Sequence, residues 1–158
     1  MIRFYFAKGH RYWRRQAETI RKTVLRFSTP DFGHALGRHA ESMFDAALPH
    51  FGFMPDGKKV TTYNGVRWML SGHDLDRVYV RDGIAYGAEI KNKLDYIDPE
   101  ELKVKLGMCR LFGIRPLFIC RMAPKSYIYE INQAGGYSII FKHQLYPHGQ
   151  GDSRRKCV

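Results

Sequence analysis

Cysteine is scarce in this chain. Its 158 residues include three cysteines, Cys109, Cys120 and Cys157, and no two of them form a CxxC pair. An odd number of isolated thiols cannot close into the complete disulfide framework that is typical of small secreted domains. The sequence therefore predicts a protein of a reducing compartment, cytoplasmic or associated with the nucleoid or nucleus, and not a secreted one.

Long apolar runs are also missing. Runs such as residues 116–120 and 137–141 have the length of β-strands, far below the roughly 20 residues that a transmembrane helix needs. The first residues lack the apolar block of a signal peptide, although residues 1–27 are rich in arginine and poor in acids, as organelle transit peptides are. We expect no membrane span, and we keep a transit peptide as the alternative to a helix that belongs to the folded protein.

Acidic residues are outnumbered. Lys and Arg total 26, Asp and Glu total 15, and the formal net charge is +11. Such an excess favours a polyanionic partner, either nucleic acid or an anionic membrane surface. Most of it lies in residues 1–30 and 150–158, while the rest of the chain is nearly balanced. The sequence therefore predicts a basic N-terminal helix at 1–30, a core domain at 31–149 and a basic tail at 150–158, which we expect to be disordered.

The basic N-terminal segment has the periodicity of an amphipathic helix. Apolar residues recur at helical spacing along one face, and arginines and lysines fill the other. The basic face can lie on a phosphate backbone, where neutralised phosphates release counterions. Two alternatives stay open: the apolar stripe packs on the core or on a second subunit, or the helix lies on a membrane surface. The residues of this segment that we assign to nucleic-acid binding are Arg11, Arg14, Arg15 and Lys22.

Turn and cap signals divide the core domain into helices and strands. The expected elements are a helix from Pro30 that ends before Gly52, one or two strands within residues 60–70, strands at 75–80 and 84–91 joined by a three-residue turn, a helix from residue 99 to Gly113, a strand at 116–120, a helix at 126–133 and a strand at 137–141. Strands that are connected through helices favour a mixed α/β sheet.

Three ionisable residues fall within the two paired strands. Glu89 and Lys91 point to the same face of their strand, because side chains alternate along a strand. Asp76 lies in the partner strand and comes close to Glu89 if the pairing register allows it. Adjacent carboxylates repel unless a cation lies between them, and Mg²⁺ is commonly held by one or two carboxylates and a substrate phosphate. The alternative is an exposed cross-strand ion pair of small energetic value.

An acid followed on the next strand by Glu-x-Lys resembles the motif of the PD-(D/E)xK nuclease superfamily. The resemblance covers roughly residues 32–142. Within the superfamily, the chain resembles small nucleases and Holliday-junction resolvases. It implies a restriction-endonuclease-like α/β fold: a mixed central sheet flanked by helices, with an αβββαβ core, here followed by a further helix and strand and preceded by the basic helix. It also implies a hydrolase, namely a Mg²⁺-dependent deoxyribonuclease that acts in restriction, repair or junction cleavage. Mn²⁺ can replace Mg²⁺ in such an enzyme.

The resemblance implies a role for each residue that matches the motif. Asp76, Glu89 and Glu41, the last on the first core helix, become the metal-binding carboxylates. Ile90 offers its backbone carbonyl to the metal, and Lys91 assists the attacking water. The alternative for Glu41 is an acid on the helix surface.

Two features of the motif leave alternatives open. The proline that gives the superfamily its name is absent, since Leu75 precedes Asp76, and the nearby Asp74 is an alternative ligand. The lysines that follow the motif are either phosphate contacts or solvated surface residues; those that we assign to nucleic-acid binding are Lys93, Lys103 and Lys105.

The expected partner is DNA. The sequence leaves open whether the substrate could instead be RNA, and whether cleavage is of the endonuclease or the exonuclease type. A single metal site cuts one strand at a time, so cleavage of both strands would require a two-fold homodimer. The competing hypothesis is a non-catalytic nucleic-acid-binding module that keeps the nuclease fold.

Overall fold

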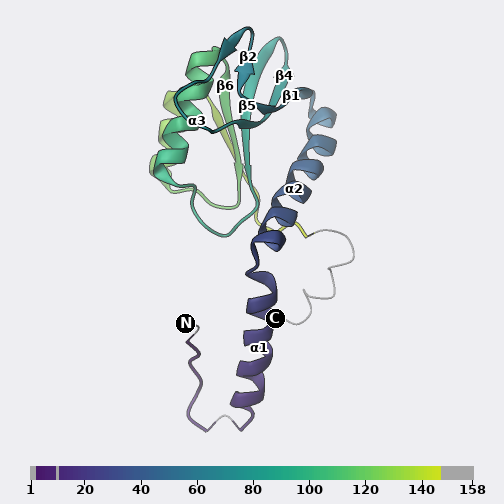
Figure 1. Ribbon diagram of the computed structural model, residues 1–158, viewed down its shortest axis with the longest axis vertical. Helices are drawn as coiled ribbons and strands as arrows, with labels where there is room; N and C mark the ends of the chain where they lie inside the picture. Colours follow the sequence, from purple (N-terminus) through teal and green to yellow (C-terminus); the bar gives the residue numbers. More distant parts are fainter. Residues whose placement is uncertain (1–2, 10, 147–158) are drawn as a thin grey trace. The chain divides into compact units, whose positions relative to one another are not determined.

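The computed structural model describes residues 3–9 and 11–146 of the chain (Figure 1). The chain divides into two compact units, Met1–Ala35 and Leu36–Val158. The predicted basic tail at 150–158 lies outside the described residues, as does Cys157. No helix in the described part of the chain is long and apolar enough to cross a membrane.

The first unit contains the predicted basic helix. α1 runs from Trp13 to Phe27, the segment that carries the apolar periodicity. The next helix, α2 (Pro30–Ala47), begins where proline at its first position predicted, and the Thr29 hydroxyl accepts the Phe32 N–H at 3.3 Å. α2 continues into the second unit and is followed by a 3₁₀ helix at Leu48–Phe51, which ends at Gly52.

A five-stranded mixed sheet is the centre of the second unit. Its order is β1-β4-β5-β6-β7, where β1 is Met54–Val60, β4 is Leu75–Arg81, β5 is Ile84–Lys91, β6 is Arg115–Cys120 and β7 is Tyr137–Ile140. β1, β4 and β5 are antiparallel, and β6 and β7 continue the sheet parallel to β5. A separate hairpin pairs β2 (Thr62–Tyr63) with β3 (Val66–Arg67).

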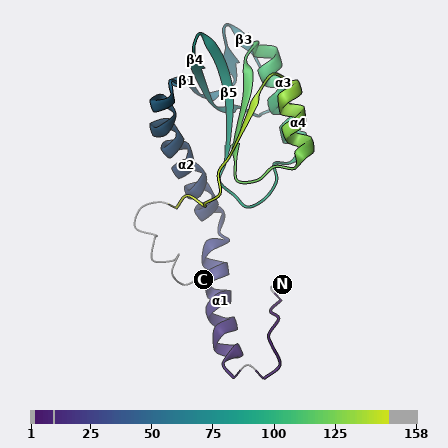
Figure 2. The same cartoon turned by 180° about the vertical axis from the view of Figure 1, so that it is seen from behind.

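Helices flank this sheet on both sides. α3 (Pro99–Phe112) and α4 (Lys125–Gln133) connect the parallel strands and lie on one face. The part of α2 that belongs to the second unit lies on the other face (Figures 1 and 2). The mixed α/β class, with a sheet between helices, is therefore confirmed.

The first strand of the sheet differs from the prediction. We expected it within residues 60–70, but that segment holds the small β2–β3 hairpin, and the sheet strand is β1, directly before it. The prediction missed β1 because this strand contains Pro55 and Gly57, and both residue types are unfavourable inside a strand. They are tolerated because β1 is an edge strand whose register shifts between Pro55 and Gly57, and proline in sheets is confined to edges and bulges.

The turn between β4 and β5 is also shorter than predicted. Arg81 pairs with Ile84, so the turn has two residues, Asp82 and Gly83, and not three. Both residues have positive φ, 51° and 75°, which is the backbone geometry of the tightest hairpin turns. The short turn sets the register of the two strands that carry the proposed site.

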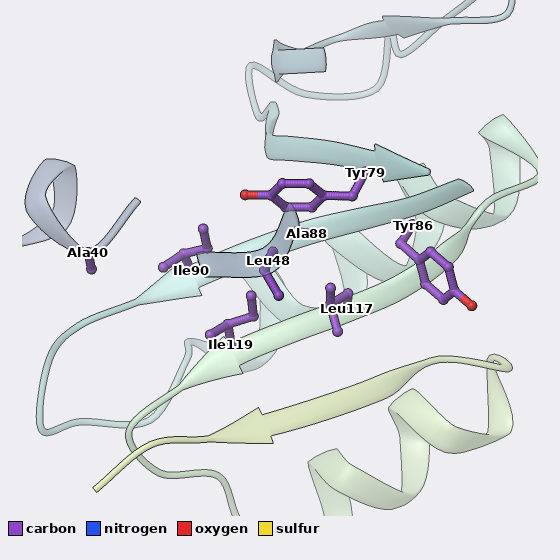
Figure 3. Packing of buried hydrophobic residues seen from close by; sticks show 8 residues of the cluster. All are labelled: Ala40, Leu48, Tyr79, Tyr86, Ala88, Ile90, Leu117 and Ile119. Atoms are coloured by element: carbon purple, nitrogen blue, oxygen red, sulfur yellow. The ribbon is translucent and has the colours of Figure 1, made fainter. Parts of the chain in front are cut away.

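Apolar layers cover both faces of the sheet. The layer between α2 and the sheet consists of Ala40, Leu48, Tyr79, Tyr86, Ala88, Ile90, Leu117 and Ile119 (Figure 3). The layer under α3 consists of Val60, Trp68, Leu75, Val78, Met108, Cys109, Phe112 and Ile114. Tyr86, Ala88 and Ile90 of β5 all enter the first layer, so alternation turns Gly87, Glu89 and Lys91 toward α3.

α3 has the predicted ends. The Asp98 carboxylate accepts the N–H groups of Glu100 at 2.9 Å and Glu101 at 3.4 Å, and Gly113, with φ of 68°, ends the helix. The capped first turn of α3 brings Glu101 and, one turn later, Lys105 to the end of β5.

Gly87 leaves no room for a side chain between β5 and α3. A Cβ atom at this position would lie 2.7 Å from Cys109 Sγ and 2.8 Å from Leu75 Cδ1. We predict that Gly87→Ala lowers the free energy of unfolding by about 1–3 kcal/mol, because the core must shift to accept the methyl group. Urea denaturation followed by circular dichroism measures this effect.

Gly37→Ala is the matched control. Gly37 lies inside α2 with no atom within 4 Å of the added methyl group, so alanine there raises the free energy of unfolding by about 0.5–1 kcal/mol. Equal stability of the two variants would contradict the close approach of β5 and α3 at Gly87.

Candidate functional site

Asp76 and Glu89 lie opposite each other where the pairing of β4 with β5 ends. The strands pair as far as Arg77 and Ala88, and one further step of this register places Asp76 opposite Glu89. Beyond that point the Ile90 N–H donates to Asp76 Oδ2 at 2.8 Å, so a carboxylate takes the place of a strand carbonyl. Asp76 is 8% exposed and Glu89 1%. The backbone of β5 therefore holds one carboxylate of the pair directly.

Glu89 contacts two lysines. Its Oε1 lies 2.7 Å from Lys91 Nζ and its Oε2 lies 2.6 Å from Lys105 Nζ. Burial and then the charge of Asp76 raise the pKa of Glu89 above its usual value, and the two lysines oppose that rise without cancelling it. A buried carboxylate beside a second one is stabilised by every cation that comes close, so this end of the sheet favours positive charge.

Lys91 lies between two acids. Its Nζ is 2.8 Å from Glu101 Oε1 in addition to its contact with Glu89, and its side chain is 23% exposed. Burial lowers the pKa of Lys91, but the carboxylates of Glu89 and Glu101 outweigh burial and the net shift is upward. In this arrangement Lys91 is a charged hydrogen-bond donor that solvent can reach.

The lysines predicted to contact phosphate lie in different environments. Lys105 is 4% exposed, and its Nζ contacts the main-chain carbonyl of Asp74 as well as Glu89. It therefore lies beneath the carboxylates and not on the surface of α3. Lys93 and Lys103 have side chains that are 54% and 66% exposed, where a phosphate could reach them.

Arg77 connects α2 to Asp76. Its guanidinium donates from Nε and Nη2 to the Asp45 carboxylate, each at 2.8 Å, and from Nη1 to the main-chain carbonyl of Asp76 at 2.6 Å. The same Nη1 lies 3.0 Å from Glu41 Oε2, and the Tyr79 hydroxyl donates to Asp45 at 2.7 Å. Glu41, nominated as the third carboxylate, thus shares Arg77 with the main-chain carbonyl of Asp76 and not with its carboxylate. The Arg77 side chain is 3% exposed.

Lys59 lies over Asp76 from the edge strand β1. Its Nζ is 3.4 Å from Asp76 Oδ1, and its side chain is 54% exposed. Its φ of 52° is a left-handed conformation that costs a lysine about 1–2 kcal/mol. Burial lowers the pKa of Lys59, but the charges of Asp76, Asp74 and Glu41 outweigh burial and raise it. Asp74, Asp76 and Glu41 therefore all raise the pKa of Lys59.

Asn92 secures the chain directly after Lys91. Its Nδ2 donates to the carbonyls of Leu36 at 3.0 Å and Leu145 at 2.7 Å, and its Oδ1 accepts the Leu145 N–H at 3.1 Å. Asn92 is 5% exposed. These bonds connect the end of β5 to α2 and to the segment after β7, so the backbone beside Lys91 is held in place from two sides.

Sequence reasoning did not identify several members of this charge cluster, namely Asp45, Lys59, Arg77, Asn92 and Glu101. Two signals were present. Arg77 stands directly before the apolar run Val78 to Val80 of β4, and a charge inside a buried strand requires a buried partner. Lys105 stands between Leu102 and Cys109 at the spacing of the buried face of α3, which indicates an inward lysine.

A divalent metal ion needs oxygen ligands that converge on one point. Within residues 3–9 and 11–146, no group of three or more His, Cys, Asp and Glu side chains is arranged to hold a metal ion. Mg²⁺, however, is commonly bound through one or two carboxylates, with water and substrate phosphate completing its shell. Asp76 and Glu89 are adjacent carboxylates of this kind, and the raised pKa of Glu89 reflects their repulsion as well as burial. The pair fits a hard cation.

Comparison of the chain with protein-family models, with curated proteins and with solved structures finds no match.

Arg77 is the cation on which two acids depend. We predict that Arg77→Met lowers the free energy of unfolding by about 2–4 kcal/mol, because Glu41 and Asp45 lose their partner and only Asp45 is partly relieved by solvent. Urea denaturation at neutral pH measures the loss. Arg110→Met, at an exposed position of α3, is the control and stays within about 0.5 kcal/mol of the wild type. A similar loss in both variants would argue against the Arg77 network.

Asp45 makes stability depend on pH. Burial raises the pKa of Asp45, but the hydrogen bonds from Arg77 and Tyr79 outweigh burial, so the net pKa lies below its usual value of 3.8. The folded state then binds fewer protons than the unfolded state, and the stabilisation is complete above about pH 4 and is lost as the pH falls through the folded-state pKa. Asp45→Asn should therefore be less stable than the wild type at neutral pH.

The pH dependence of that difference is the measurement. The gap between wild type and Asp45→Asn should narrow below about pH 4 in denaturation curves taken across the acid range. Asp95→Asn, at a side chain that is 73% exposed, is the control. A gap that stays constant with pH would show that the Asp45 carboxylate is not the titrating group.

Proposed function

We propose that the chain is a metal-dependent nuclease that hydrolyses phosphodiester bonds in DNA. The observation that carries this proposal is the position of Asp76 beside Glu89 where the pairing of β4 with β5 ends, with Lys91 on the same face as Glu89. The resemblance to the PD-(D/E)xK superfamily supports it. So does the element order after α1, since a helix, three sheet strands, a helix and a strand are what the restriction-endonuclease-like fold requires.

Mg²⁺ is the proposed cofactor, with Mn²⁺ as its substitute. Asp76 and Glu89 would hold it, with the Ile90 carbonyl as a further donor. Glu41, which the resemblance nominates as the third carboxylate, would have to move toward them to join, since no three such side chains of the described residues are arranged to hold a metal ion. When bound, the ion would polarise the scissile phosphate and lower the pKa of the attacking water. The surrounding residues keep the two principal carboxylates in position: the Ile90 N–H binds Asp76, and Lys105 binds Glu89.

Lys91 is the residue that we assign to the attacking water and the transition state. Its ammonium group remains charged between Glu89 and Glu101 and is partly exposed. A fixed cation at this position can orient a water molecule and offset the negative charge that develops on the phosphate. Lys93 and Lys103, both exposed, are the proposed contacts to the phosphates on either side.

The central test is cleavage of supercoiled plasmid DNA with Mg²⁺. Lys91→Ala and Glu89→Gln should each reduce the rate by at least about 100-fold, because they remove the donor to the water or a metal ligand. DNA binding without metal should persist in both variants, and thermal unfolding should show that both are folded. Lys125→Ala, which removes an exposed lysine of α4 that has no role in the proposed site, should still cleave. Undiminished cleavage by both site variants would refute the assignment.

A non-catalytic nucleic-acid-binding module is the second candidate function. One observation favours it: both oxygens of Glu89 contact lysines and Lys59 lies on Asp76, so lysines already neutralise the pair. Calorimetric titration with Mg²⁺ and Mn²⁺ separates the two functions. Binding that is lost in Asp76→Asn supports the nuclease, whereas no metal binding together with a steep salt dependence of DNA affinity supports the module.

A further inference from the structure

Aromatic and basic side chains are interspersed at the start of the chain. We define the aromatic platform as Tyr5, Phe6, Arg11, Tyr12, Trp13 and Arg14. All of these residues belong to the first unit, and the proposed nuclease site of the second unit uses none of their aromatic rings. The four rings are 88%, 37%, 61% and 43% exposed for Tyr5, Phe6, Tyr12 and Trp13. Exposed rings in such number are costly in water and mark a surface that binds a partner.

Three contacts join rings and cations of the platform. The ring centroids of Phe6 and Trp13 are 5.5 Å apart. The Arg14 guanidinium lies 5.1 Å from the Trp13 ring centroid, and that of Arg11 lies 5.8 Å from the Tyr12 ring centroid. An open hollow of about 520 Å³, lined in part by Phe6, Arg11 and Trp13, lies among them. The platform thus offers π faces and positive charges at one place.

Single-stranded nucleic acid carries the complementary groups. Each nucleotide has a negative phosphate and, when unpaired, a free base face that can stack on an aromatic ring. A duplex offers its phosphates but keeps its base faces inside the stack. We propose that the aromatic platform binds single-stranded nucleic acid, with unpaired bases stacked on Tyr5 and Tyr12 and phosphates bound by Arg11 and Arg14.

The charges on the platform favour nucleic acid over a membrane. A helix that lies in a membrane interface buries a continuous apolar face and keeps its basic residues on the opposite side. Here Arg11 and Arg14 lie directly over the rings of Tyr12 and Trp13, so inserting the rings into lipid would take the guanidinium groups with them at a large desolvation cost. When the platform binds a single strand, the guanidinium groups of Arg11 and Arg14 pair with its phosphates.

The test uses the full chain in EDTA with fluorescently labelled oligonucleotides. Oligo-dT of about 30 nucleotides, longer than the site size of typical single-strand binding domains, is compared with a duplex of the same length by fluorescence anisotropy. The wild type should bind the single strand more tightly than the duplex. Tyr5→Ala with Tyr12→Ala should weaken single-strand binding by at least about tenfold and change duplex binding by less than about twofold.

Two double variants serve as controls. Tyr5→Phe with Tyr12→Phe keeps both rings and should bind like the wild type, because stacking does not need the hydroxyl groups. Tyr129→Ala with Tyr137→Ala removes tyrosines of the second unit that are 65% and 53% exposed, and it should also bind like the wild type. A loss of the same size in the second control would overturn the proposal, as would equal affinity of the wild type for duplex and single strand.

The last measurement is binding of the chain to vesicles of phosphatidylcholine and phosphatidylglycerol. Vesicle binding that depends on Tyr5 and Tyr12, without a preference for single strands, would assign the platform to a membrane surface and overturn the proposal. The measurement needs no metal, so its outcome is independent of the proposed nuclease activity. A chain that binds single strands but never cleaves would refute only the nuclease, and a nuclease without single-strand preference would refute only the platform.

Discussion

Two carboxylates remain buried at the end of the sheet because a lysine ammonium group or a backbone N–H lies close to each of their oxygens. Asp76 accepts the N–H of Ile90 and lies against Lys59, while Glu89 contacts a lysine on either side. An unpaired buried charge would cost several kcal/mol. Two features around the site meet this requirement: the buried face of α3 includes Lys105, and the Ile90 N–H binds Asp76 where the pairing of β4 with β5 ends.

The same requirement connects the architecture with the proposed chemistry. A pair of adjacent carboxylates attracts any cation, whether an ammonium group, a divalent ion or both in turn. The nuclease and the binding module therefore differ in the cation that completes the pair and not in the fold around it. The charge of the core domain is nearly balanced, while the basic excess lies at the ends of the chain.

Local patterns were the most reliable guide to the fold. Proline after Thr29, the acids after Asp98 and the glycine at position 113 placed the ends of two helices correctly, because capping depends on a few consecutive residues. β1 was missed because its proline and glycine are acceptable only at a sheet edge, and whether a strand is an edge strand depends on its neighbours. The β4–β5 turn was predicted at the right place, but one residue too long.

The sequence by itself determined that Glu89 and Lys91 share a face of one strand, since the two-residue period of a strand is a local property of the backbone. It also determined where most helices and strands of the core begin and end. Only the tertiary structure decided that Arg77 binds Glu41 and Asp45, that Lys105 lies beneath Glu89 and that Lys59 lies over Asp76. Each of these contacts joins elements that are distant along the chain, and their approach depends on how the helices and the edge strand pack on the sheet.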